Sequence, residues 1–141
     1  MEYKNDLEDF KVNVKIRLSA LWTSLMFCYI YGDYFELYVP KKVEGLVSGE
    51  NLLDSPMKLF VATILLTIPA LMIFLSIMLK PKLNRLLNLI FGTLYTALML
   101  LIAFKSIATW LTFYVFLAIV ESLISSIIVW NAWTWAKKKN K

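Results

Sequence analysis

Long apolar runs alternate with short polar segments along the whole chain. Four runs stand out, at residues 18–38, 57–79, 86–104 and 110–133. Each is about as long as the ~20 residues that a helix needs to cross the hydrocarbon core of a membrane. The second run, LFVATILLTIPALMIFLSIML, has no polar stripe at helical spacing, which a helix on the surface of a soluble bundle would show. The pattern therefore predicts four transmembrane helices.

The segments between the runs predict how these helices are arranged. The connections around Pro81, of about six residues, and near the sequence KSIATW are short, whereas the loop from Val39 to Asp54 is long. Ser55 and Pro56 follow that loop as a helix N-cap and first helical residue. Because short connections force neighbouring helices to be antiparallel, we expect an all-α membrane protein, an antiparallel four-transmembrane-helix bundle.

Residues 1–17, before the first run, have apolar side chains at one helical face, namely Tyr3, Leu7, Phe10 and Val14. This segment is an interfacial helix on the inner leaflet, a cytoplasmic extension of the first span, or a disordered tail. The domains we expect are this cytoplasmic or interfacial segment, a transmembrane domain at 18–135, and a basic cytoplasmic tail at 136–141.

The basic residues predict the orientation of the bundle, because cytoplasmic loops of membrane proteins are enriched in Lys and Arg. Eleven basic residues fall on the side of the two termini: Lys4, Lys11, Lys15, Arg17, Lys80, Lys82, Arg85, Lys137, Lys138, Lys139 and Lys141. The opposite side carries Lys41, Lys42, Lys58 and Lys105. We therefore expect a multi-pass protein of the plasma membrane with both termini cytoplasmic. Since topology accounts for the net charge of +5, we expect no nucleic-acid partner.

The composition narrows the chemistry of the protein. A hydrophobic fraction of 60% exceeds the roughly 45–50% of soluble domains. Cys28 is the single cysteine and histidine is absent, which excludes a disulfide framework, thiolate metal sites and imidazole bases. We therefore predict no cofactor and no metal, and we find no catalytic motif.

Polar residues in the first and third runs predict a cluster near the outer surface. Asp33 lies about 9 Å outward of the middle of its span, and Glu36 and Lys105 lie farther out. We expect Lys105 to pair with Glu36, with Asp33 nearby, beneath the long loop. One helical stripe is expected to face inward: Trp22, Met26, Tyr29, Asp33 and Glu36. The alternative is that Asp33 and Glu36 simply end the span in the interface.

Glu121 lies near the middle of the fourth run, where an ionised carboxylate costs roughly 2.5–3.5 kcal/mol on insertion scales. No Lys or Arg shares its depth. We therefore expect it to face the bundle as a neutral group that is hydrogen-bonded to hydroxyls at similar depth, such as Tyr29, Thr67, Tyr95 and Thr96.

Further residues predict close helix packing. Two stripes with helical spacing would let helices approach closely, one at Ala118, Ser122 and Ser126 and one at Asn84, Asn88 and Gly92. Pro69 has no N–H, so it should bend the second span and leave the carbonyl of Leu65 without its helical partner.

Three strings of the chain resemble a family of short prokaryotic four-helix membrane proteins classed as a domain of unknown function. They are KIRLSALWTSLMFCYIYGDYFELYVP, LTIPALMIFLSIMLKPKLNRLLNLIFG and IVESLISSIIVWNAWTW, and the likeness covers nearly the whole chain. The resemblance implies the architecture above and no particular activity. It also implies an acid in many members where Thr67 stands here.

Three functions fit these residues. The first is binding or translocation of a small ligand or proton through a polar interior around Asp33 and Glu121. The second is a structural or accessory membrane subunit, in a homo-oligomer or docked to a membrane partner. The third is a membrane enzyme, which the lack of a nucleophile–base pair disfavours. The candidate ligand or proton site comprises Tyr29, Asp33, Glu36, Thr67, Tyr95, Lys105 and Glu121.

Overall fold

The computed structural model describes residues 10–135, which form five α-helices and one 3-10 turn. Their bounds are α1 Val14–Glu36, α2 Lys42–Ser48, α3 Pro56–Met78, α4 Pro81–Lys105, η1 Thr109–Leu111 and α5 Thr112–Trp133. The prediction of an all-helical fold is confirmed. Most of the predicted amphipathic segment at 1–17 and all of the basic tail at 136–141 lie outside the described residues.

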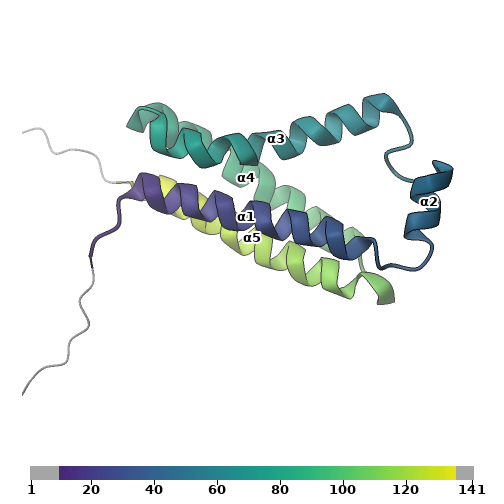
Figure 1. Ribbon diagram of the computed structural model, residues 1–141. Helices are drawn as coiled ribbons and strands as arrows, with labels where there is room; N and C mark the ends of the chain where they lie inside the picture. The colour runs from purple at the N-terminus through teal and green to yellow at the C-terminus, as the bar shows by residue number, and fades with distance from the viewer. Residues whose placement is uncertain (1–9, 136–141) are drawn as a thin grey trace, which may run out of the picture.

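The four long helices lie along one another, and consecutive ones run in opposite directions (Figure 1). Residues 10 and 135 are therefore at the same end of the bundle, whereas α2 lies across the other end. Helix α5 packs extensively against α4 and also against α1, and α1 packs against α3 as well. Helices α3 and α4 make few contacts although they are consecutive in the chain.

Three helices within the described residues are long and apolar enough to cross a membrane. They are α3, α4 and the continuous segment from Thr109 to Trp133. Helix α1 is as long as α3, 23 residues, but it is not one of these three candidate spans. Its serines, tyrosines and tryptophan, together with Asp33, lower its mean hydropathy.

The connection between the second and third long helices is shorter than the predicted six residues. Helix α4 begins at Pro81 rather than at residue 86, so it follows α3 after two residues, Leu79 and Lys80. Proline at the first position of a helix lacks an N–H that would have no partner there. The charges of this segment had suggested a loop, but they lie on the first turns of a helix.

The ends of α1 and the long loop also differ from the prediction. Helix α1 begins at Val14, with the side chain of Asn13 accepting a hydrogen bond from the Lys15 N–H at 2.9 Å. The loop contains α2, which ends at Gly49 with a φ of 80°. Glycine adopts this left-handed conformation without steric cost, so it ends the helix where hydropathy gave no signal.

Helix α3 starts as predicted and bends near its middle (Figure 1). The Ser55 hydroxyl accepts a hydrogen bond from the Lys58 N–H at 3.3 Å, and Pro56 is the first helical residue. The buried residues of this helix are Pro69, Met72 and Ser76, all in its second half. The first half of α3 therefore has no residue that the rest of the chain buries.

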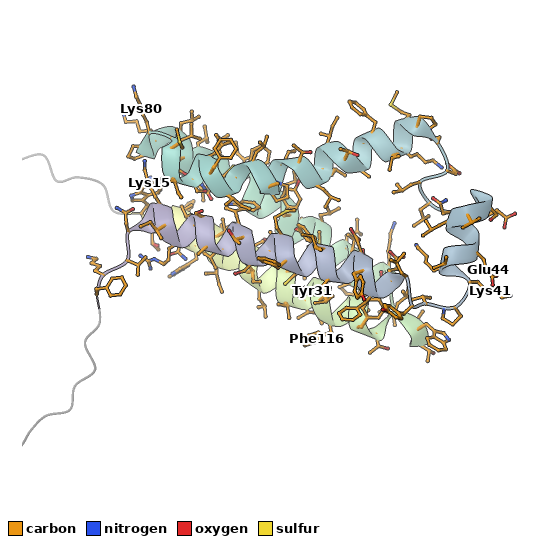
Figure 2. The ribbon with its side chains drawn as sticks, in the orientation of Figure 1. Lys15, Tyr31, Lys41, Glu44, Lys80 and Phe116 are labelled. Atoms are coloured by element: carbon orange, nitrogen blue, oxygen red, sulfur yellow. The ribbon has the colours of Figure 1, made fainter. Side chains whose placement is uncertain are left out.

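The core is a narrow cluster along the bundle axis, made of Leu18, Trp22, Leu25, Tyr29, Met72, Tyr95, Met99 and Ile128. Most large apolar side chains lie outside it, and Figure 2 shows Phe116 directed away from the bundle. Phe116 is 65% exposed and Leu123, on the same helix, is 59% exposed. Such an apolar exterior is typical of helices that face lipid.

Candidate ligand site

A cavity of about 180 Å³ lies among the four long helices, and we call it the central cavity. Leucine, isoleucine, methionine and alanine side chains make up most of its wall. Its polar lining residues are Tyr29 and Asp33 of α1, Tyr95 of α4, and Tyr114 and Glu121 of α5. Four of the seven residues predicted for the site therefore line one cavity: Tyr29, Asp33, Tyr95 and Glu121.

Glu121 faces the bundle, as predicted, and is 5% exposed. Its carboxyl group, however, makes no hydrogen bond with any residue from 10 to 135. Three of the four expected hydroxyl partners, Thr67, Tyr95 and Thr96, are engaged elsewhere. Thr67 is exposed and donates to the Thr63 carbonyl, while the Thr96 hydroxyl lies 2.8 Å from both the Gly92 carbonyl and the Ser125 hydroxyl. The predicted internal bonding of Glu121 was therefore wrong. For Thr67 and Thr96 the reason is that helical threonine hydroxyls bond readily to carbonyls of their own preceding turn.

The hydroxyl of Tyr29 is a second polar group without a partner in the described part of the chain. Tyr29 is 7% exposed, and its ring lies 6.4 Å from that of Tyr95, measured between centroids. Buried polar groups are nearly always hydrogen-bonded, to protein or to ordered water. The central cavity thus brings together two buried groups that can still bind something.

The Tyr95 hydroxyl is committed to the backbone of α3. It donates a hydrogen bond to the Leu65 carbonyl, four residues before Pro69. Because Pro69 has no N–H, this carbonyl has no helical partner, as the sequence predicted. Tyr95 therefore holds the bent middle of α3 against α4 and forms one wall of the cavity.

A second, wider cavity of about 680 Å³ lies beneath the segment that contains α2, and we call it the loop cavity. Asp33, Glu36, Lys42, Lys105 and Tyr114 line it, together with apolar residues of that segment. Asp33, Tyr114 and Ile102 also line the central cavity, so the two spaces adjoin at these residues.

The inward stripe predicted for α1 is correct at Trp22 and Tyr29 and shifted elsewhere. The buried face continues to Gly32, whereas Asp33 lies at its edge and is exposed. The observed stripe follows the helical period as well as the predicted one, so periodicity alone did not distinguish the two stripes. Its residues are Leu18, Trp22, Leu25, Tyr29 and Gly32.

The predicted ion pair between Lys105 and Glu36 was wrong. Lys42 forms it instead, with 2.5 Å between its Nζ and a carboxylate oxygen of Glu36. Helix α2, which the sequence analysis did not predict, brings Lys42 back over the end of α1. Lys105 is exposed and lines the loop cavity. Within residues 10–135, no three His, Cys, Asp or Glu side chains could together hold a metal ion.

A chain of buried hydrogen bonds joins three helices at the end that holds residues 10 and 135. The Trp22 indole N–H donates to the Asn88 side chain at 2.7 Å, and Asn88 donates to the Asn84 side chain at 2.7 Å. Asn84 in turn donates to the Ser76 carbonyl of α3. Sequence reasoning treated these asparagines as a packing edge, although two amides one turn apart in an apolar run were the signal for such a network.

Two basic side chains, Lys15 and Arg85, complete this region. We call it the tethered end, and its residues are Lys15, Trp22, Ser76, Asn84, Arg85 and Asn88. Lys15 of α1 donates to the Ile77 carbonyl at 3.0 Å. Arg85 of α4 donates to the carbonyls of Ala132 at 3.0 Å and Trp133 at 3.2 Å. Each cation thus binds the last carbonyls of a neighbouring helix, where the helix dipole favours positive charge.

The fold and its polar interior define an all-helical protein in which three helices could cross a membrane by length and composition. The chain belongs to the Family of unknown function (DUF6326), whose model matches residues 6–141. The predicted resemblance to a family of unknown function is thereby confirmed. No match was found among curated proteins or among solved structures.

Proposed function

We propose that the protein is a multi-pass protein of the plasma membrane that crosses it with all four long helices, both termini being cytoplasmic. The length of α1, 23 residues, suffices for a crossing. An even number of crossings agrees with residues 10 and 135 lying at the same end (Figure 1). Lys15 and Lys80 are at that end and Lys41 is at the other (Figure 2), so the predicted charge asymmetry supports this orientation.

Within this bundle, the protein binds or translocates a small ligand or a proton through the interior around Asp33 and Glu121. The observation that carries this proposal is that one cavity is lined by both carboxyl groups. Glu121 lies deep in it, and Asp33 stands where the central cavity meets the loop cavity. An acid at membrane depth is costly, and such residues commonly mark ion and substrate pathways.

We assign the cavity to binding or transport rather than to catalysis. Its polar lining consists of carboxyl and phenol groups, and a nucleophile with an adjacent base is not among the lining residues of the described chain.

Proton movement tests this function in liposomes that contain the purified full chain and a pH-sensitive dye. We expect a potassium diffusion potential to drive proton entry, and we expect Glu121→Gln to reduce the entry to that of protein-free liposomes. Glu44→Gln is the matched control, because Glu44 lies on α2 away from the cavity (Figure 2). If Glu121→Gln equals the wild type both in proton entry and in ligand-dependent melting, Glu121 has no functional role.

A second candidate is a structural or accessory subunit, and the first half of α3 favours it. Because residues 10–135 bury no residue of this half, it presents an apolar surface to lipid or to another helix. A homo-oligomer or a membrane partner would cover this surface. Native mass measurement in mild detergent tests this candidate: a stable dimer that Phe60→Lys dissociates would support it, and a monomer would argue for the ligand site alone.

A further inference from the structure

The charge of the central cavity indicates the kind of ligand that fits it. Asp33 and Glu121 are its acidic lining residues, and among the described residues no Lys or Arg lines it. Lys42 and Lys105 line the loop cavity instead, and Lys42 is already paired with Glu36. A ligand that brings a positive charge would therefore supply the partner that these carboxyl groups lack.

The polar atoms that remain free in the cavity are suited to accept hydrogen bonds. Carboxylate oxygens are acceptors, and a phenol oxygen can accept as well as donate. Glu121 and Tyr29 have no partner within residues 10–135, whereas the Tyr95 hydroxyl is committed to the Leu65 carbonyl. An ammonium group has N–H donors and no acceptor, so it matches this pair.

The aromatic wall adds a second attraction for a cation. The Tyr95 ring lies between the Trp22 ring, at 6.0 Å, and the Tyr29 ring, at 6.4 Å, measured between centroids. Tyr114 of α5 also lines the cavity. A cation within about 6 Å of the face of a tyrosine ring is attracted by its quadrupole, and more strongly where water is excluded.

The rest of the wall requires an apolar body of limited size. Leu65, Leu66, Leu98, Met99, Ile102 and Leu117 line the cavity. Its volume of about 180 Å³ is slightly larger than the roughly 150 Å³ of an engineered apolar cavity that holds benzene. One ring, or an alkyl group of similar volume, with a short charged arm would fill it.

We propose that the central cavity binds a protonated amine with a small apolar body, its ammonium group held between Glu121 and Tyr29. This inference rests on the proposed function, and it names the class of ligand for the same site. Asp33 stands at the mouth toward the loop cavity, where its carboxyl favours cations over anions.

The test is isothermal titration of the purified full chain in a neutral detergent with 2-phenylethylamine and with 2-phenylethanol. The two probes have the same number of heavy atoms, and the amine is positively charged at neutral pH. We expect the amine to bind at least about tenfold more tightly than the alcohol. Glu121→Gln should abolish this preference, and Tyr29→Phe should reduce it severalfold.

Three matched variants separate the site from other effects. Glu44→Gln and Tyr31→Phe remove the same chemical groups outside the cavity, and Tyr31 is 53% exposed, so both should bind like the wild type. Ala62→Phe fills the cavity from α3, so it should abolish binding of both probes, which distinguishes the cavity from uptake into detergent micelles. Helical circular dichroism and melting of Glu121→Gln verify that this variant is folded.

The outcomes distinguish this inference from the function on which it rests. If the alcohol binds as tightly as the amine, and Ala62→Phe abolishes both, the ligand is not a cation while the cavity remains a small-molecule site. If neither probe binds but Glu121→Gln stops proton entry into liposomes, the amine site is wrong and the proton pathway stands. If Glu121→Gln keeps the tenfold preference, the cation is bound elsewhere and the inference fails.

Discussion

The two ends of the bundle hold their helices together in different ways. At the tethered end, side-chain hydrogen bonds link α1, α3 and α4, and Lys15 and Arg85 bind the last carbonyls of neighbouring helices. At the other end, α3 has no buried residue in its first half, and two cavities lie between the helices. The ion pair described there, Glu36 with Lys42, joins α1 to α2 and does not link two of the long helices.

This difference teaches how a small bundle can be both stable and hollow. In lipid, apolar surfaces gain little from meeting one another, so close packing and hydrogen bonds hold helices together. The tethered end uses nearly all of its polar groups in this way, although the Ser76 hydroxyl has no partner within residues 10–135. The other end, which we call the open end, is the one that holds α2 and the two cavities. It leaves Tyr29 and Glu121 without partners among residues 10–135, and only a bundle fixed elsewhere can keep such groups in place.

The largest effect on stability is expected from Asn88→Leu. Leucine has a similar shape to asparagine, but the change leaves the buried Trp22 N–H without its acceptor and removes the donor to Asn84. We expect a loss of about 2 kcal/mol in the free energy of unfolding. Titration of the folded protein in mixed micelles with sodium dodecyl sulfate measures this loss.

Asn131→Leu is the control for that variant. Asn131 is at the same end of the bundle, but its side chain donates to the Ile127 carbonyl of its own helix. We expect a change within about 0.5 kcal/mol. Equal losses for the two variants would mean that the network does not hold the helices together.

An intermediate effect on the free energy of unfolding is expected when alanine replaces one of two helical glycines. The change should be destabilising at Gly92 and stabilising at Gly32. In Gly92→Ala, the new Cβ would lie 2.8 Å from the Val129 Cγ2 and 3.3 Å from the Ile128 Cγ2, on the closely packed face of α5. Overpacking costs roughly 1–3 kcal/mol, which exceeds the gain in helix propensity. We therefore expect a net loss of about 1 kcal/mol, measured by the same titration.

Gly32→Ala is the counterpart near the open end. The new Cβ would meet Leu117 at 3.6 Å and Tyr114 at 3.7 Å, which are ordinary contact distances. Alanine should then stabilise α1 by roughly 0.5–1 kcal/mol. A loss for Gly32→Ala as large as that for Gly92→Ala would show that both ends are packed alike.

The smallest effect is expected from Lys42→Met, which removes the ion pair over the end of α1. Both side chains keep about a quarter of their surface exposed, 25% for Lys42 and 27% for Glu36. Such pairs contribute roughly 0–1 kcal/mol, so we expect a loss well below that of Asn88→Leu. A loss greater than that of Asn88→Leu would reverse the comparison between the two ends.

Hydropathy and turn residues predicted much of this fold. The four apolar runs correspond to α1, α3, α4 and α5, and the start of α3 at Pro56 was predicted correctly. The start of α4 and the presence of α2 were not, because charged residues in helices resemble loops when only hydropathy is considered. The free carbonyl of Leu65 could be predicted since it follows from the covalent structure of Pro69, one turn away.

The sequence by itself determined that the four long apolar segments are helical and that Glu121 must face the interior, since these depend on hydropathy and on the cost of a carboxylate in lipid. Only the tertiary structure decided which groups meet: Lys42 rather than Lys105 at Glu36, Asn88 at Trp22, and no side chain within residues 10–135 at the Glu121 carboxyl. The reason is that helices with an apolar surface all round can rotate and tilt at little cost. Their contacts are then set by a few hydrogen bonds between residues far apart in the chain.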